Sequence, residues 1–404
     1  MLTRKYPAVG HGALYIEEIH PNNAVDRDLV YVYDCGSKTS KLIIDRIDEN
    51  FEENQIIDAV FISHLDDDHI NGLDHLLRRC RVQHLYFPLI SRRHLLLVHF
   101  LNVCNATYNK HAPYTLGFTS SFISNPCAAI HSLQLHHTPI LHPVRPSENA
   151  AAPDDDYTWI FETIRNLHMN AEDIRSGSNV ASRIALANSP YPQELSNWAY
   201  IPFNFNHATN YALLEAKLQT LLGTVPTPEQ LLDRASDDTT GADFIKDCKK
   251  IYEKLFNRHN SYTMTLYSGP AVSTPHLPRV MTLRQIYFDP LSHKYKTYSP
   301  GCLYTGDYEA ANTPKFDELQ NAYTNYLAHI GSIQIPHHGS KYSYNPDLVS
   351  INHFSFISCN PSYLRLPPHA HVLTDLINRA IPLRIITDEQ NTEVRIDVLR
   401  IDVR

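Results

Sequence analysis

The stretch of sequence that decides the fold runs from Ile56 to Leu73 and reads IIDAVFISHLDDDHINGL. Its first part, Ile56–Ser63, is an apolar run rich in β-branched residues, which is typical of a strand buried on both faces. A polar loop follows, and the spacing of apolar residues then predicts a helix over Leu73–Arg79. A buried strand, a polar loop and a helix in this order indicate a layered α/β protein.

The polar loop carries four potential metal ligands within a few residues: His64, Asp66, Asp68 and His69. A tight loop can direct all of them at one point, whereas a regular strand would send alternate side chains to opposite faces. Imidazole and carboxylate together suit Zn, Mn or Fe, and the carboxylates favour harder ions such as Mn or Mg. The alternative is a solvated acidic turn, which the flanking histidines and the buried strand disfavour.

Other strand-like runs also end in polar residues. The runs 13–16 and 29–33 are β-rich, and the second ends at Asp34. Near the C-terminus, the run 301–304 leads into Thr305, Gly306 and Asp307. Because side chains at strand ends converge on one edge of a sheet in layered α/β folds, we expect these residues to gather there. Alone, an Asp after Gly is more often a turn residue.

Two histidine-rich turns come later in the chain. The segment 336–340 reads PHHGS and follows a predicted strand, and the segment 367–371 reads PPHAH. Two adjacent histidines are not expected to point the same way. We therefore expect His337 and His338 to divide their roles, one binding metal and the other orienting a ligand or donating a proton. Without the other motifs, such a pair is more often found on the protein surface with no specific role.

The middle of the chain differs from both ends. It has a polar, proline-containing part and then amphipathic helical patterns at 211–222 and 243–256. Between them, Thr227 and Pro228 form a helix start signal. We interpret this region as a largely helical insertion or accessory lobe. The predicted parts are 1–104, 105–256 and 257–404, the outer two being halves of one α/β fold.

Composition limits the classes of function. The 404 residues carry a formal net charge of −8, which excludes a generally basic nucleic-acid coat and gives no reason to expect a membrane partner. The seven cysteines are widely spaced without a CxxC pair, which favours a location in the reducing cytosol. There is no apolar secretory signal and no apolar stretch of about 20 residues. We expect a soluble, cytoplasmic protein.

Taken together, the motifs resemble one known family. They are, in order, VGHG (9–12), YDCG (33–36), SHLDDDHINGL (63–73), NS (260–261), LYTGD (303–307), PHHGS (336–340) and PH (368–369). This series resembles the metallo-β-lactamase-fold hydrolases. The branch that it resembles most is the soluble metallo-hydrolase domain of competence-type DNA-uptake proteins. The HxDxDH form of the loop and the PHHGS segment are the most specific marks. The resemblance covers roughly residues 1–100 and 256–404.

The resemblance implies an αββα sandwich with two divalent ions, Zn or Mn, at the edge of two facing sheets. It implies that His64 and Asp66 face one ion, that Asp68 and His69 face the other, and that Asp307 bridges both.

The same resemblance implies roles for residues outside the loop. His337 or His338, together with His369, would complete the ligand shells, and Asp34 would support the metal loop from behind. The expected catalytic residues are Asp68, His338 and His369.

The sequence also departs from the family pattern. Asp66 stands where many members have a histidine, and Ala13 stands where competence-type members often have an acidic residue. Many relatives place a further histidine between the metal loop and the Gly-Asp motif. His142, His207 and His259 are the candidates here, although each can also be an ordinary histidine.

The expected chemistry follows from the metals. Two divalent ions about 3.5–4 Å apart can hold a hydroxide and clamp a phosphoester, so phosphodiester hydrolysis of nucleic acid or a nucleotide is the leading hypothesis. The net negative charge weighs less against it because two such ions would offset about four charges. One alternative is hydrolysis of another ester, a thioester or a lactam. Another is a partner-dependent subunit of a multi-protein assembly, such as a prokaryotic defence system, docking through residues 105–256.

Overall fold

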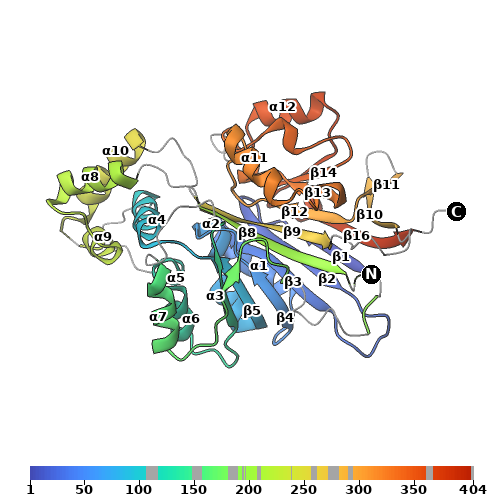
Figure 1. The fold of residues 1–404 in the computed structure, drawn as a ribbon, viewed down its shortest axis with the longest axis horizontal. Coiled ribbons are helices and arrows are strands. Elements are labelled where there is room, and N and C mark those ends of the chain that lie inside the picture. Colours follow the sequence, from blue (N-terminus) through green and yellow to red (C-terminus); the bar gives the residue numbers. More distant parts are fainter. Residues whose placement is uncertain are drawn as a thin grey trace.

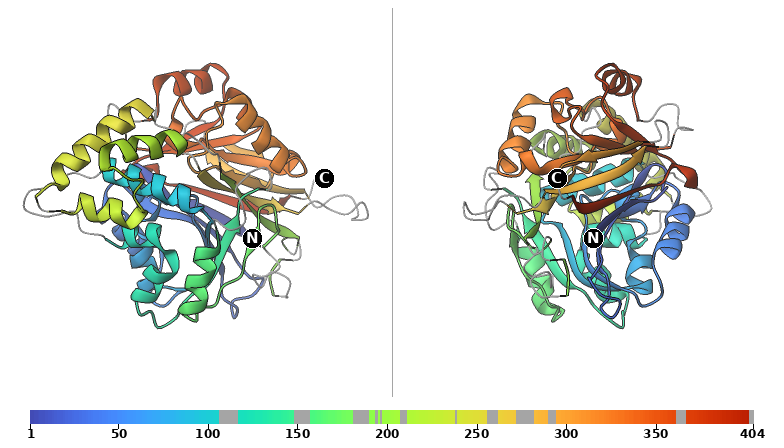
Figure 2. Two further views of the ribbon diagram at one scale, coloured as in Figure 1. Left: turned by 60° about the vertical axis from the view of Figure 1, so that its left-hand side comes forward. Right: turned by 90° about the vertical axis from the view of Figure 1, so that its right-hand side faces the viewer.

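The structure is a computed structural model that describes residues 1–105, 117–147, 157–180, 190–192, 195, 197–206, 211–237, 239–255, 262–271, 282–289, 294–360 and 367–401. Two β-sheets face each other, and helices lie on the outer faces of both (Figure 1). Figure 2 shows the sheets between the blue helix on one side and the orange and red helices on the other. The expected αββα sandwich is confirmed.

The first sheet joins both ends of the chain. Its strand order is β11-β10-β16-β1-β2-β3-β4-β5-β6-β7. The strands are β1 (Leu2–Tyr6), β2 (Gly12–Ile19), β3 (Leu29–Ser37), β4 (Ile56–Phe61), β5 (Arg81–Pro88), β6 (Ile140–Arg145), β7 (Ile174–Arg175), β10 (Thr282–Asp289), β11 (Lys294–Tyr298) and β16 (Val394–Ile401). Neighbours are parallel from β3 to β7 and antiparallel from β11 to β3. The parallel part contains the predicted buried strand, β4.

The second sheet has the order β15-β14-β13-β12-β9-β8. Its strands are β8 (Trp198–Asn206), β9 (Tyr262–Pro270), β12 (Gly301–Tyr304), β13 (Ile330–Gln334), β14 (Phe354–Ser358) and β15 (Leu383–Ile386). The strands from β12 to β15 are parallel, and β12, β13 and β14 are buried along their whole length. Burial on both faces explains why these strands read as nearly continuous apolar runs.

Helices cover the outer face of each sheet. The helices of the described residues are α1 (Ser40–Asn50), α2 (Asp67–Ile70), α3 (Leu73–Arg79), α4 (Arg92–Asn105), α5 (Phe118–Ser124), α6 (Pro126–Ser132), α7 (Thr158–Asn166), α8 (Tyr211–Leu222), α9 (Pro228–Ala235), α10 (Gly241–Leu255), α11 (Thr313–Ala322) and α12 (Ala370–Asn378). Short 3-10 turns are η4 (Leu327–His329), η5 (His337–Gly339), η6 (Pro346–Leu348) and η7 (Gln390–Thr392). Ile43 of α1 and Leu76 of α3 share one core with the first sheet. Phe316 of α11 and Leu376 of α12 share another core with the second sheet.

Tyrosines fill much of the space between the two sheets. The ring centroids of Tyr33 and Tyr304 lie 5.0 Å apart, and those of Tyr15 and Tyr304 lie 5.6 Å apart. The Tyr33 hydroxyl donates to the Met264 carbonyl at 2.8 Å, and the Tyr15 hydroxyl lies 3.0 Å from Ser358 Oγ. A buried tyrosine needs such a partner, and each of these contacts links one sheet to the other.

A buried ion pair within the first sheet forms hydrogen bonds to the second sheet. Arg4 Nε donates to Glu17 Oε1 at 2.7 Å, and both side chains are almost fully buried. The hydroxyls of Ser268, Tyr200 and Tyr304 donate to the same Glu17 carboxylate. These bonds compensate the cost of burying the carboxylate, so the network is stable only when it is complete.

Residues 105–256 contribute to both sheets. Within the described residues, β6 and β7 extend the first sheet, β8 pairs with β9 in the second, and α5–α7 cover the first sheet. The helices α8, α9 and α10 pack on α4 around a separate small core and project from the sandwich (Figure 1). The predicted helix at 211–222 is present, and Thr227 caps α9 in a capping box. The boundaries of an accessory lobe remain a prediction.

Two further observations bear on the expected environment. All seven cysteines are buried free thiols. In the parts of the chain that the structure describes, no helix is long and apolar enough to cross a membrane.

Candidate metal centre

The polar loop after β4 lies tightly against the backbone of β2 and β3. A Cβ atom added to Gly36 would lie 2.5 Å from the carbonyl carbon of Asp68 and from the backbone nitrogen of His69. Only glycine permits this approach of two backbones. The loop then turns into the short helix α2, whose N-cap residue is Asp66. The side chains of the loop are thus held at the edge where the two sheets meet.

Asp34 fixes the orientation of His69. The carboxylate is fully buried; its Oδ1 accepts from Ser63 N at 2.7 Å, and its Oδ2 accepts from Ser63 Oγ at 2.7 Å. His69 Nδ1 lies 2.8 Å from the same Oδ2, so this nitrogen carries the proton and Nε2 faces Asp307. Asp34 holds this position with a backbone φ of 58°. A carboxylate behind a histidine is the usual way to orient a metal ligand.

Asp307 lies at the centre of the site. Its Oδ1 is 3.4 Å from His69 Nε2 and 3.9 Å from His338 Nε2. Its Oδ2 is 3.7 Å from His64 Nε2 and 3.4 Å from His337 Nε2. Each oxygen therefore faces a different pair of imidazoles, which is the arrangement of a carboxylate that can bridge two cations.

The His337-His338 pair reaches both oxygens because of its backbone. Both residues have positive φ values, 50° and 53°, and Gly339 follows with 83°. Such conformations are costly for residues other than glycine and cluster at functional sites. The adjacent histidines reach Asp307 from different directions, with His337 Nε2 facing Oδ2 and His338 Nε2 facing Oδ1, both within 4 Å. The left-handed turn is the reason, because it places the two rings on either side of one carboxylate.

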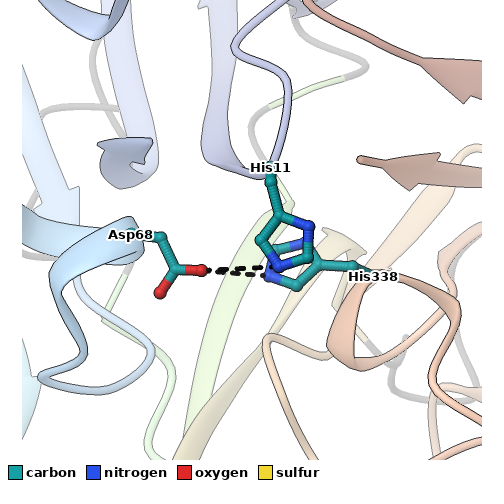
Figure 3. A group of neighbouring side chains, drawn as sticks. All are labelled: His11, Asp68 and His338. Atoms are coloured by element: carbon teal, nitrogen blue, oxygen red, sulfur yellow. Dashed lines mark ion pairs between the residues drawn. The ribbon is translucent and has the colours of Figure 1, made fainter. Parts of the chain in front are cut away.

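A second group of ligand atoms forms around Asp68. His338 Nε2 and His11 Nε2 each lie 3.7 Å from Asp68 Oδ2 (Figure 3). Lys38 Nζ lies 3.9 Å from the same oxygen, and its side chain is 39% exposed. His11 comes from the turn before β2 and was not among the ligands expected from the sequence. Its only signal was its place in the VGHG motif.

The separations between these donor atoms suit metal ions. Two atoms that bind one ion at about 2.0–2.2 Å stand about 3.3–3.8 Å apart when the angle between them is about 110–120°. The separations around Asp307 and Asp68 are 3.4–3.9 Å, longer than the 2.7–3.2 Å that is usual for a hydrogen bond between nitrogen and oxygen. The Nε2 atoms of His69 and His338 are buried without a hydrogen-bond partner among the described residues. The residues therefore fit divalent cations.

The electrostatics of Asp307, His64 and His11 agree with this interpretation. For His69, burial would lower the pKa, but Asp34 and Asp307 outweigh it and raise the pKa well above its usual value, which a bound cation would offset. Burial would raise the pKa of Asp307, but the neighbouring His337, His69 and His64 outweigh it and hold the pKa well below its usual range. Burial lowers the pKa of His64 to about 4 and that of His11 to about 2. Both imidazoles are thus neutral at pH 7 and have a lone pair for a metal. Partial burial and repulsion from Asp68 and Asp307 raise the pKa of Asp66 to about 7, and a bound cation would lower it.

The structure brings together most of the predicted site residues. His64, His69 and Asp307 form one group of close ligand atoms, with Asp66 Oδ2 3.7 Å from His64 Nε2. Asp68 and His338 form the other group with His11. The expected sharing of one ion by Asp68 and His69 is therefore not reflected in these groups, and it stays a prediction.

The remaining predicted residues lie outside both groups. His369 is the N-cap residue of α12; its Nδ1 accepts from Lys341 N at 3.2 Å, beside the His337-His338 turn. His142 lies on β6 and its Nε2 is 2.9 Å from His84 Nδ1. His207 and His259 lie outside the described residues.

Comparison with known proteins supports the fold and the coarse chemistry. A family model described as the metallo-beta-lactamase superfamily matches residues 24–101, which include Asp34 and the whole metal loop. No curated protein matches the chain. The match and the two-sheet fold agree with a metallo-β-lactamase α/β fold and point to a metal-dependent hydrolase. The competence-type branch remains a prediction.

Proposed function

We propose that the protein is a metal-dependent phosphodiesterase or nuclease acting on nucleic acid or nucleotides. The observation that carries this proposal is the position of Asp307, whose two oxygens face two different pairs of imidazoles. Two bound divalent ions would supply a water of lowered pKa and neutralise charge on the oxygens of a phosphoester. Zn²⁺ and Mn²⁺ both suit a set of imidazoles and carboxylates.

The side chains around the ions would position the substrate. Asp66 and His337 are 33% and 22% exposed, whereas His64 and His69 are buried, so substrate would approach from the Asp66 side. Lys38 lies beside Asp68 on the exposed side of the second group. Its ammonium group can bind a phosphate oxygen as a point charge.

His369 is proposed to donate a hydrogen bond to an oxygen of the phosphoester. Its Nδ1 accepts the backbone N–H of Lys341, so the neutral ring carries its proton on Nε2. Its side chain is partly exposed next to the turn that holds His337 and His338.

The test is a cleavage assay with the purified protein loaded with Mn²⁺ or Zn²⁺. Single- and double-stranded DNA, RNA and cyclic nucleotides are offered, and we expect metal-dependent cleavage of at least one. The double variant Asp68→Ala, His69→Ala should abolish it, while His75→Ala, a partly exposed histidine paired with Asp48, should not. Absence of cleavage of every phosphodiester by the metal-loaded wild type would contradict the proposal.

The same assay separates the alternative chemistries. Thioester and lactam substrates are offered beside the phosphodiesters, and faster turnover of either would reassign the substrate class. The projecting helices α8–α10 favour the partner-dependent alternative, because they form a separate core away from the sheets. Full turnover by the isolated protein would contradict that alternative, and turnover only with a co-purified protein would support it.

A further inference from the structure

His11 occupies an unexpected position at the metal centre. It lies outside the segment 24–101 that matches the family model, in the turn between β1 and β2. Its imidazole is only 4% exposed and packs on the ring of His338, with a centroid separation of 4.0 Å. Figure 3 shows His11 and His338 reaching toward the same carboxylate, Asp68, from different parts of the chain. Three elements distant in sequence therefore meet at this point.

The backbone around His11 is fixed by several contacts. Lys38 N donates to the His11 carbonyl at 2.8 Å, and Gly10 N donates to the Thr387 carbonyl at 3.1 Å. Gly10 has a φ of 68°, and a Cβ atom on Gly12 would lie 2.3 Å from the Gly36 carbonyl oxygen. The turn is thus locked onto the strand that also supports the metal loop. This placement holds the imidazole in position before any ligand binds, which reduces the entropic cost of binding.

The distances distinguish a shared ion from a hydrogen bond. His11 Nε2 and His338 Nε2 are both 3.7 Å from Asp68 Oδ2, and the three ligand atoms all lie within 4.8 Å of one another. Elsewhere in the chain, His20 Nδ1 and Asp28 Oδ1 pair directly at 3.0 Å. The longer spacing at Asp68 is the one that two ligands of a common ion have, as worked out above.

The orientation of His338 provides a second, independent observation. Its Nδ1 lies 2.8 Å from the Ser358 carbonyl oxygen, to which only a protonated nitrogen can donate. The lone pair of the neutral ring is therefore on Nε2, which is buried and faces Asp68 without a hydrogen-bond partner in the described part of the chain. A histidine that donates its other N–H to a carbonyl is the usual form of a metal ligand.

We propose that His11 is a ligand of the metal ion bound by Asp68 and His338. Two imidazoles and a carboxylate form a set that suits Zn²⁺, Mn²⁺ or Fe²⁺. The side chains of His11 and His338 are each 3% exposed, so solvent has little access to these two ligand atoms.

This inference rests on the metal-binding part of the proposed function and not on the substrate. Protein stripped of metal is reloaded with Zn²⁺ or with Co²⁺, whose absorption spectrum reports the ligands. Bound ions are counted by mass spectrometry, and their affinities are measured by competition with a chelator. We expect the wild type to bind two ions. His11→Gln should weaken the binding of one of them by at least about a hundredfold, beyond the effect of removing a supporting partner.

Control variants separate loss of a ligand from loss of the fold. His11→Cys keeps a ligand atom and should recover much of the Zn²⁺ binding with an altered Co²⁺ spectrum. His75→Gln should leave both readouts unchanged. Thermal unfolding of the metal-free His11→Gln protein, similar to that of the wild type, would show that the fold persists.

The proposal is overturned if His11→Gln binds as many ions as the wild type, with the same affinities and the same Co²⁺ spectrum. It is also overturned if the wild type binds no Zn²⁺ or Co²⁺. If two ions bind as described but no phosphodiester is cleaved, the proposed function fails while the role of His11 stands.

Discussion

Replacing Asp34 with asparagine should change the tautomer of His69. Asp34 Oδ2 accepts from Ser63 Oγ and from His69 Nδ1, at 2.7 and 2.8 Å, while Oδ1 accepts from Ser63 N. In Asp34→Asn the amide oxygen can stay on Ser63 N, so the amide NH₂ then faces His69 Nδ1. The serine hydroxyl can rotate, but the imidazole must present a lone pair to the amide. Its proton therefore moves to Nε2, the nitrogen that faces Asp307.

A protonated Nε2 cannot bind a metal ion, so the variant should bind metal more weakly. Loss of the group that supports a metal-binding histidine costs about 10–100-fold in affinity, which is about 1.4–2.7 kcal/mol. Titration calorimetry of the metal-free protein with Zn²⁺ measures this affinity, and nitrogen-15 NMR of the histidines reports the tautomer of His69. Both quantities should change together.

Asp58→Asn is the matched control for this variant. Asp58 is a buried aspartate on β4, the strand that leads into the metal loop, and it pairs with Arg27 and with the backbone nitrogen of Val30. Its replacement should lower stability and leave metal affinity unchanged. If Asp34→Asn binds Zn²⁺ as the wild type does, or if His69 keeps its tautomer, the proposed role of Asp34 is wrong.

The other predictions concern stability and the shape of the loop. Glu17→Gln should cost about 3–5 kcal/mol, because it leaves Arg4 buried beside a neutral group, and the urea midpoint measures this loss. Burial lowers the pKa of His99 to about 4, against about 6.5 in the unfolded chain, so stability should fall as pH drops through this window, by up to about 3 kcal/mol. His99→Gln should remove that part of the pH dependence in urea unfolding at pH 7 and 4.5; an unchanged slope would contradict it. Gly36→Ala should displace the metal loop, weaken Zn²⁺ binding and destabilise by about 1–3 kcal/mol, whereas Gly117→Ala, whose added Cβ meets nothing within 4 Å, should not.

Sequence patterns predicted a strand or helix correctly where the residues that form the pattern are consecutive in the chain. The apolar run that became β4, the helix at 211–222 and the Thr227-Pro228 helix start are all present. The strands β6 and β8 gave no comparable signal. Each contains a proline, Pro143 and Pro202, and their partners lie far away in the chain. Their place in the sheets depends on these distant partners and not on their own periodicity.

The metal centre shows the same difference between what local sequence patterns predict and what depends on distant partners. The residues of the loop 64–69 share one short segment, so their types and spacing indicated metal binding without any structure. The conformation of His337 and His338 could not be read from their sequence, because adjacent residues face one carboxylate only when the backbone is left-handed. His11 is a further case, because its relevance depends on a turn that folds back over the loop.

The sequence by itself determined the α/β class, the buried strand before the metal loop and the ligand chemistry of that loop. These properties depend on residue types at short, fixed spacings along the chain, so they can be predicted without knowledge of the fold. Only the tertiary structure decided that Asp307 stands between four imidazoles and that His11 joins Asp68 and His338. The physical reason is that a metal centre requires donor atoms about 3–4 Å apart, and residues hundreds of positions apart reach that spacing only through the packing of two sheets.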